Sequence, residues 1–265
     1  MKFKILCSDL DGTLLATKNN VSDFAVSEIS RIAAFTKIIL VSARMPKSMR
    51  YVQKRLGIED EPIICYNGGL VLAGTNVLSS TEVTTHLLKE IHEMAAALNV
   101  KLGLYRMDDW FVEQDTERVQ KEIYHTKATP VFQATEKTLD QWEQNGIGAH
   151  KLMLMGTKSA IDVLYLQLSK KLSSQVHLYR SNDTLIEVAS KTISKLSAIQ
   201  LLLKKKETLA DVIAFGDNYN DVEMLQHVGC GVAVANAREE AKQVADYVTL
   251  KNTEDGVAHF IRQHL

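Results

Sequence analysis

Short apolar runs recur near both ends of the chain, and each run ends at a polar or glycine-bearing turn. The runs are 3–9, 37–44, 62–69, 211–218, 230–236 and 246–250. Near-continuous apolar runs are typical of strands that are buried on both faces, as in a parallel sheet. Amphipathic helical patterns separate them at 22–34, 46–56, 194–204, 219–227 and 238–244. This alternation predicts an α/β fold with a doubly wound, Rossmann-like parallel sheet.

The middle of the chain has a different pattern. Apolar residues follow a helical stripe over 84–99, and two short apolar stretches then flank Asp108 and Asp109 like the strands of a hairpin. Further helices are expected at 116–125, 137–144 and 158–171, with strands at 129–133, 150–155, 176–180 and 184–188. Tight turns between successive strands indicate antiparallel pairing. We therefore expect an α+β domain at 81–188, inserted between core segments at 1–80 and 189–265.

Composition narrows the class of protein. The 265 residues are 46% apolar and carry 31 basic against 32 acidic side chains, so no basic excess points to nucleic acid. No apolar stretch approaches the roughly 18 residues of a membrane span, and the first apolar run is too short for a signal peptide. The three cysteines, Cys7, Cys65 and Cys230, are too widely spaced for a disulfide framework or a zinc site. A cytoplasmic protein is expected.

Two carboxylates stand where the first predicted strand ends. Asp9 and Asp11 are two residues apart and therefore start on the same side of an extended chain, and Gly12 allows the chain to turn. Two like charges this close raise each other's pKa unless a positive group lies between them. The pair therefore predicts a cation close to Asp9 and Asp11.

Polar residues also follow other predicted strands. Ser42 and Arg44 end the second, an Asn67-Gly68 turn ends the third, and Asp217, Asn220 and Asp221 follow a later one. Ligands of open α/β sheets bind beyond the carboxyl ends of the strands, so these residues are expected to converge on one crevice. Carboxylate oxygens without histidine or cysteine favour Mg²⁺.

Together these residues resemble the four motifs of the haloacid dehalogenase-like (HAD) phosphatases. The motifs correspond to "DLDGT" at 9–13, the serine after the second strand, a lysine before a later helix, and "GDNYND" at 216–221. The insertion is similar to the type-IIB (C2B) cap of the Cof-like subfamily, which also has segments like "NGG" at 67–69 and "VAVANA" at 232–237.

The resemblance implies a role for each matching residue. Asp9 would attack phosphorus and form an aspartyl-phosphate, while Asp11 would act as general acid and then as general base. Mg²⁺ would be held by Asp9, Asp217 and the Leu10–Asp11 backbone, with Asp221 either a direct ligand or a partner of the ligands.

Other residues would bind the phosphoryl group or the rest of the substrate. The phosphate-binding set comprises Leu10, Ser42, Ala43, Lys195 and Asn220. Lys191 is the alternative lysine, but Lys195 directly precedes the amphipathic pattern and is preferred. Arg44, Asn67 and Gly68 are candidates for substrate contact, although Ser42 also suits a helix N-cap and Arg44 an ion pair. In the cap, the candidates are Tyr105, Trp110, His125 and Asp183.

The predicted function is a Mg²⁺-dependent phosphatase of small phosphorylated metabolites, with sugar phosphates favoured because a cap restricts large substrates. A sugar phosphomutase is the alternative within enzymes. A non-catalytic, phosphate-responsive module is the alternative from another class, but such modules do not need the second carboxylate, Asp11. The identity of the substrate and the oligomeric state are left open by the sequence.

Overall fold

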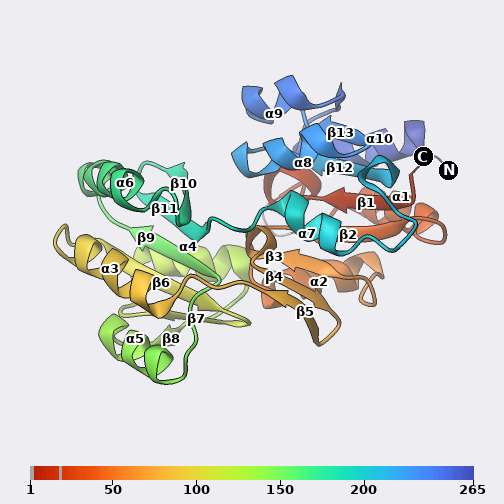
Figure 1. The fold of residues 1–265 in the computed structure, drawn as a ribbon. Coiled ribbons are helices and arrows are strands. Elements are labelled where there is room, and N and C mark those ends of the chain that lie inside the picture. The colour runs from red at the N-terminus through yellow and green to blue at the C-terminus, as the bar shows by residue number, and fades with distance from the viewer. Residues whose placement is uncertain (1–2, 18–19) are drawn as a thin grey trace. The chain divides into compact units, whose positions relative to one another are not determined.

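The computed structural model describes residues 3–17 and 20–265, and the chain divides into two compact units. The core unit comprises Met1–Leu78 and Ser194–Leu265, and the inserted unit comprises Ser79–Ile193 (Figure 1). The chain thus crosses between units at 78/79 and 193/194, where the sequence prediction has 80/81 and 188/189.

The core unit is built on an eight-stranded sheet in the order β14-β13-β12-β1-β2-β3-β4-β5. Its strands are β1 (Ile5–Ser8), β2 (Lys37–Val41), β3 (Ile63–Cys65), β4 (Leu70–Ala73), β5 (Asn76–Ser80), β12 (Val212–Gly216), β13 (Cys230–Ala233) and β14 (Tyr247–Val248). The pairs from β14 to β3 are parallel. The central strands are buried on both faces, as their continuous apolar runs predict.

Two groups of helices pack around this sheet (Figure 1). The first group contains α1 (Asp23–Ile32), α2 (Lys47–Leu56) and α10 (Gly256–His264), and the second contains α7 (Lys195–Leu201), α8 (Val222–His227) and α9 (Glu239–Val244). All of these helices except α10 were predicted, and each predicted helix begins within three residues of its expected start. The prediction succeeds because the spacing of apolar residues marks the buried face of a helix. A doubly wound α/β core is confirmed.

The sequence prediction assigns no element to residues 70–80, where the structure has strands β4 and β5. β4 pairs antiparallel with β3, and Gly74, with φ +59°, lies in the turn before β5. The two β5 residues Val77 and Leu78 are exposed, so this strand lacks the buried apolar run that identifies the others.

The inserted unit is a six-stranded sheet in the order β10-β11-β9-β6-β7-β8. Its strands are β6 (Lys101–Arg106), β7 (Asp109–Val112), β8 (Val131–Phe132), β9 (Lys151–Met155), β10 (Val176–Asn182) and β11 (Leu185–Ser190), and its helices are α3 (Thr85–Ala96), α4 (Glu117–Thr126), α5 (Thr135–Gln144) and α6 (Lys158–Leu172). Side chains from α3, α5 and α6 pack on one face of the sheet and form a separate apolar core. The predicted β6–β7 hairpin is present.

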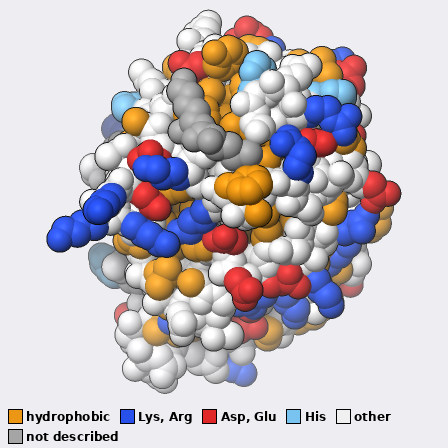
Figure 2. Space-filling model, turned by 90° about the vertical axis from the view of Figure 1, so that its right-hand side faces the viewer, with side chains coloured by type: hydrophobic (Ala, Val, Ile, Leu, Met, Phe, Trp, Pro, Cys, Tyr) orange, Lys and Arg blue, Asp and Glu red, His pale blue; other side chains and the backbone are white. Residues whose placement is uncertain are grey.

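Side-chain caps explain where several of these helices begin. Thr84, Thr116 and Thr157 each accept a hydrogen bond from the backbone N–H three residues later, at the start of α3, α4 and α6. No helix within residues 3–17 and 20–265 is long and apolar enough to cross a membrane. On the face drawn in Figure 2, basic and acidic side chains lie interspersed.

Candidate active site

The candidate site lies at the carboxyl ends of β1 and β12, which are neighbours in the core sheet. The chain proceeds from β1 to β2 on one side and later returns to place β12 on the other. Such a switch in strand order leaves a crevice at the carboxyl edge, where open α/β sheets bind their ligands. Asp9 directly follows β1, and Asp217 directly follows β12.

Lys195 joins two of the predicted carboxylates. Its Nζ donates to Asp9 Oδ1 and to Asp221 Oδ1, each at 2.6 Å. The Lys195 and Asp221 side chains have no exposed surface, and that of Asp9 is 7% exposed. A charge buried in this way is stable only when it is paired. Lys195 is the first residue of α7, whose N-cap is Ser194.

Asp217 completes the cluster and is held by the loop that follows β1. Thr13 Oγ1 donates to Asp217 Oδ1 at 3.0 Å. A Cβ atom on Gly12, where φ is +83°, would lie 2.6 Å from Asp217 Oδ2, so the close approach of this loop requires glycine. Asn236 Nδ2 donates to the Gly12 carbonyl at 2.8 Å and fixes the loop from the other side.

The cluster holds more acidic than basic side chains, and this changes their pKa values. Burial raises the pKa of Asp9 well above its ordinary range, and the nearby Asp221 and Asp217 raise it further, against the lowering effect of Lys195. Burial and the Asp221 charge raise the pKa of Asp217 to about 7. Burial would lower the pKa of Lys195, but its two carboxylate partners outweigh burial and raise it. Three carboxylates thus share one ammonium.

This donor set fits a divalent cation. Asp9, Asp217 and Asp221 each offer an oxygen, and these oxygens all lie within 4.8 Å of one another. Hard carboxylate oxygens are the ligands of Mg²⁺, which typically takes one or two protein carboxylates and fills its remaining positions with water and substrate oxygens. A bound divalent cation would place positive charge beside Asp9 and Asp217 and would lower their raised pKa values.

Asp221 differs from the other two because both of its oxygens already have partners. Oδ1 accepts from Lys195, and Oδ2 accepts from the backbone N–H groups of Asp217 and Asn218 at 3.0 Å. A Cβ atom on Gly216 would lie 2.5 Å from Asp221 Cβ, so glycine is needed at the end of β12 as well. Asp221 therefore orients Lys195 and the Asp217 loop.

Asp11 lies apart from this cluster, with its side chain 49% exposed. Arg44 Nε donates to Asp11 Oδ2 and Arg44 Nη2 donates to Oδ1, both at 2.7 Å. Arg44 is itself buried, and its Nη1 donates to Tyr51 Oη at 2.9 Å and to the Ser48 carbonyl at 3.3 Å. All three guanidinium nitrogens of Arg44 therefore donate hydrogen bonds, and two of them fix the orientation of the Asp11 carboxylate.

The remaining predicted phosphate ligands lie on adjacent loops. Ser42 follows β2, and its Oγ accepts from the Arg44 N–H at 3.2 Å, which leaves its hydroxyl hydrogen available for a ligand oxygen. Ala43, next to it, is half-buried, and Leu10 is buried after β1. Asn220 Nδ2 donates to Asn67 Oδ1 at 2.9 Å, and this bond uses one of its two amide hydrogens.

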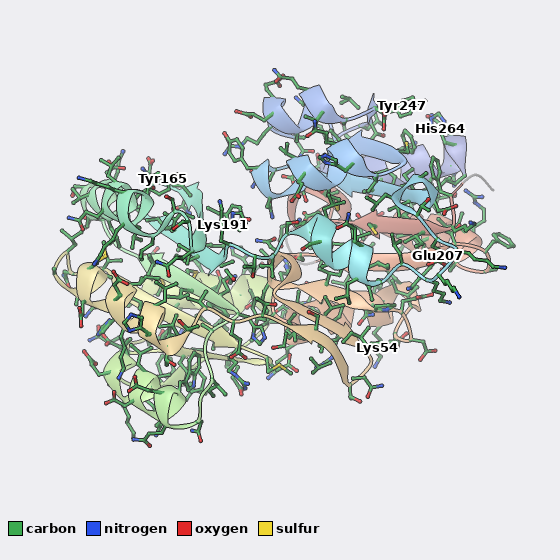
Figure 3. The ribbon with its side chains drawn as sticks, in the orientation of Figure 1. Lys54, Tyr165, Lys191, Glu207, Tyr247 and His264 are labelled. Carbon is green, nitrogen blue, oxygen red and sulfur yellow. The ribbon has the colours of Figure 1, made fainter. Side chains whose placement is uncertain are left out.

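Other predicted residues lie elsewhere. Lys191 belongs to the inserted unit, on the connection between β11 and α7, and its Nζ is 3.5 Å from His177 Nδ1 (Figure 3). Tyr105 and Trp110 are buried and stacked on each other. Asp183 is exposed beside Arg180, and His125 contacts the Tyr124 ring.

Sequence reasoning did not single out Thr13, Tyr51 or Asn236. Thr13 carried a usable signal, because it is the last residue of the "DLDGT" motif at 9–13. Tyr51 carried none, because it acts through Arg44, which lies before its helix. Asn236 lies in the "VAVANA" segment, but its contact with the distant Gly12 carbonyl could not be predicted from the sequence.

Comparison with known proteins finds relatives that match this chain over nearly its whole length. A family model described as haloacid dehalogenase-like hydrolase matches residues 6–261. The HMP-PP phosphatase of Yersinia pseudotuberculosis is 26% identical over 269 residues, covering 99% of this chain and 96% of that protein. A haloacid dehalogenase-like hydrolase from Bacteroides thetaiotaomicron has a TM-score of 0.89 at 27% identity, with 100% of both chains covered.

A sugar phosphatase of HAD subclass IIB shares the fold, with a TM-score of 0.81 at 22% identity over 98% of both chains. The family model spans nearly the whole sequence, including every residue of the carboxylate cluster. The chain therefore belongs to the haloacid dehalogenase-like hydrolase family.

Proposed function

We propose that the protein is a Mg²⁺-dependent phosphatase that transfers a phosphoryl group from a small ester to Asp9 and then to water. The observation that carries the proposal is the buried cluster of Asp9, Asp217 and Asp221 around Lys195. Phosphoryl transfer needs mainly positioning and charge neutralisation, and this cluster is built for both.

In the first step, an Asp9 carboxylate oxygen forms a bond to phosphorus while the phosphorus–oxygen bond of the ester breaks. The leaving oxygen takes a proton from the Asp11 carboxyl group. In the second step, Asp11 removes a proton from water, the water oxygen attacks phosphorus, and the Asp9 carboxylate leaves.

The other residues neutralise the negative charge of the site and bind the phosphoryl oxygens. Asp9 and Asp217 would hold the metal, which neutralises charge on the phosphoryl group when bound. Lys195 offsets the negative charge that remains, and Asp221 orients Lys195. Ser42, the Ala43 amide and Asn220 would donate to phosphoryl oxygens, and the Leu10 backbone would contribute at the same edge. Arg44 holds Asp11 in place rather than contacting the substrate.

For the substrate, we propose small phosphorylated metabolites. The named relatives support this class: one acts on HMP-PP and another, which shares the fold, is a sugar phosphatase. The inserted unit, which carries its own apolar core, is proposed to set the preference among substrates.

The test is phosphate release from a panel of sugar phosphates, HMP-PP and a generic aryl phosphate. The wild-type protein is measured with Mg²⁺ and with EDTA, and Asp9→Asn is measured with Mg²⁺. We expect release that requires both the metal and Asp9, with a loss of at least about a thousandfold in the variant. Equal release from Asp9→Asn would contradict the mechanism. Transfer of phosphate to a second hydroxyl, without release, would identify a mutase instead.

A further inference from the structure

Three consecutive residues between β3 and β4 have left-handed backbone conformations. The φ angles are +53° at Tyr66, +56° at Asn67 and +105° at Gly68. Positive φ is uncommon for residues other than glycine and is most unfavourable for bulky side chains such as tyrosine. Such conformations persist where the surrounding structure imposes them, and they concentrate at functional sites.

Backbone and side-chain contacts tie this turn to two loops of the candidate site. The Tyr66 N–H donates to the Arg44 carbonyl at 3.2 Å, and the Asn67 N–H donates to the Ser42 carbonyl at 2.9 Å. On its other side, Asn67 Oδ1 accepts from Asn220 Nδ2 at 2.9 Å. The turn therefore connects the loop after β2 with the loop after β12.

A third connection reaches the helix that carries Lys195. A Cβ atom on Gly68 would lie 2.4 Å from the Ser194 carbonyl oxygen, a distance that real Cβ atoms do not adopt. Ser194 is the N-cap of α7, and Lys195 is the first residue of that helix. The absence of a side chain at Gly68 thus allows the start of α7 to approach β3 closely.

We propose that the turn Tyr66–Gly68 is a positioning device: Asn67 orients the Asn220 amide, and Gly68 sets the position of Lys195. Asn67 is only 4% exposed, and its side-chain oxygen accepts a hydrogen bond from Asn220. This assigns Asn67 and Gly68 a role other than the substrate contact expected from the sequence. The proposal rests on the proposed phosphatase function.

The first test separates the Asn67 side chain from its backbone conformation. Asn67→Gly removes the carboxamide but tolerates the positive φ, so the turn itself is not strained. We expect kcat/KM for the best ester to fall about tenfold, the usual effect of one misplaced hydrogen-bonding group, with a parallel rise in the inhibition constant of inorganic phosphate.

A double-mutant cycle distinguishes positioning from a general structural role. If Asn67 acts through Asn220, Asn67→Gly should have little further effect on kcat/KM in an Asn220→Ala background. Fully multiplicative losses in the double variant would overturn the proposal. Asn99→Gly is the matched control, because Asn99 also has a positive φ, of +55°, but lies in the inserted unit. It should leave kcat and KM unchanged.

The second test uses two glycines that both have a positive φ but differ in their surroundings. Gly68 and Gly74 both have positive φ, but a Cβ on Gly74 would meet nothing within 4 Å. Gly68→Ala therefore combines a φ of +105°, outside the left-handed region that L residues adopt, with a clash against Ser194, whereas Gly74→Ala, at +59°, brings only mild backbone strain. We expect kcat to fall about a hundredfold or more in Gly68→Ala and less than about threefold in Gly74→Ala. Equal kcat values in the two folded variants would overturn the role of Gly68.

Failure of this proposal can be told apart from failure of the proposed function. A wild-type protein that releases no phosphate from any ester contradicts the function. Calorimetric binding of inorganic phosphate to the Mg²⁺-loaded protein then serves as the readout for the same Asn67 and Asn220 variants. Wild-type-like phosphate binding by Asn67→Gly, with loss of binding in Asn220→Ala, would overturn the positioning role. Should Gly68→Ala fail to fold, the Asn67 cycle alone decides.

Discussion

Lys195 contacts Asp9 and Asp221 at the same 2.6 Å distance, yet one ammonium serves three carboxylates. Burial and, after it, the nearby Asp221 charge raise the pKa of Asp217 to about 7. A bound divalent cation would relieve this repulsion. Metal binding, protonation and stability are therefore linked at this site.

The first prediction concerns this linkage. Because the folded-state pKa of Asp217 is raised, its protonation stabilises the metal-free fold fully below its ordinary pKa, and this stabilisation is lost as pH rises through about 7. Mg²⁺ competes with the proton, so its stabilising effect should be larger at about pH 8 than at about pH 5.5. We expect a difference of about 1.4 kcal/mol per pH unit below 7.

Thermal unfolding with and without Mg²⁺ at the two pH values measures this effect. Asp217→Asn should abolish most of the Mg²⁺ increment at both. A Mg²⁺ increment that is equal at the two pH values in the wild type would contradict the linkage.

The second prediction concerns the ion pair between Arg44 and Asp11. Arg44→Gln removes the two hydrogen bonds that fix the Asp11 carboxylate, so proton donation to the leaving group should suffer. We expect kcat to fall about tenfold to a hundredfold for alkyl phosphates and little for dinitrophenyl phosphate, whose leaving group needs no proton.

Steady-state rates across esters of different leaving-group acidity provide the measurement. Arg55→Gln, which removes an exposed partner of Asp23, is the control and should change neither rate. An equal loss on both substrates in Arg44→Gln would indicate a structural role only.

Much of the site was predictable at the residue scale. Asp9, Asp217 and Asp221 follow recognisable strand ends, and Lys195 directly precedes a helical pattern, so their convergence follows from the sheet topology. The commitment of both Asp11 oxygens to Arg44 was not predictable. It depends on the direction of a long side chain that starts on a neighbouring loop.

Glycine lets the elements of the core approach one another closely. A Cβ atom on Gly231, in β13, would lie 2.1 Å from the Leu225 carbonyl oxygen of α8. Helix α8 begins just after Asp221, so its position against the sheet also fixes the end of the loop that follows β12. Strand and helix patterns alone do not reveal this, because hydrophobic periodicity predicts elements but not their separation.

The third prediction follows from this contact. Gly231→Ala should lower the free energy of unfolding by about 1–3 kcal/mol, as expected for overpacking against backbone. Gly103→Ala is the matched control, since Gly103 is also in a strand but a Cβ there would make ordinary contacts of 3.4–3.6 Å. Denaturant unfolding of both variants measures the difference, and equal effects would contradict the account of the α8 contact.

The whole molecule consists of one unit inserted into another. The inserted unit is a single continuous segment with its own apolar core, whereas the core sheet places β1 beside β12, from the far end of the sequence. The sequence predicted this organisation because the parallel pattern stops and later resumes. It missed β4, which follows β3 after a short turn, and β5, whose exposed residues lack an apolar signal.

The fourth prediction concerns folding of the two units. A fragment of residues 79–193 should unfold cooperatively in denaturant, because its strands and helices find all their main partners within it. A fragment of residues 1–78 should not, because β1 would lack its β12 neighbour. Circular dichroism measures both, and a non-cooperative 79–193 fragment would contradict the division into units.

The central claim is that Asp9 accepts the phosphoryl group. The most direct measurement is mass spectrometry of peptides from Asp11→Asn, in which water attack is slowed, after acid quenching during reaction with Mg²⁺ and an aryl phosphate. We predict that the mass of one phosphoryl group is added to the peptide containing Asp9 and disappears in Asp9→Asn/Asp11→Asn. Phosphate release by Asp11→Asn with no phosphorylated Asp9 peptide at any quench time would contradict the claim.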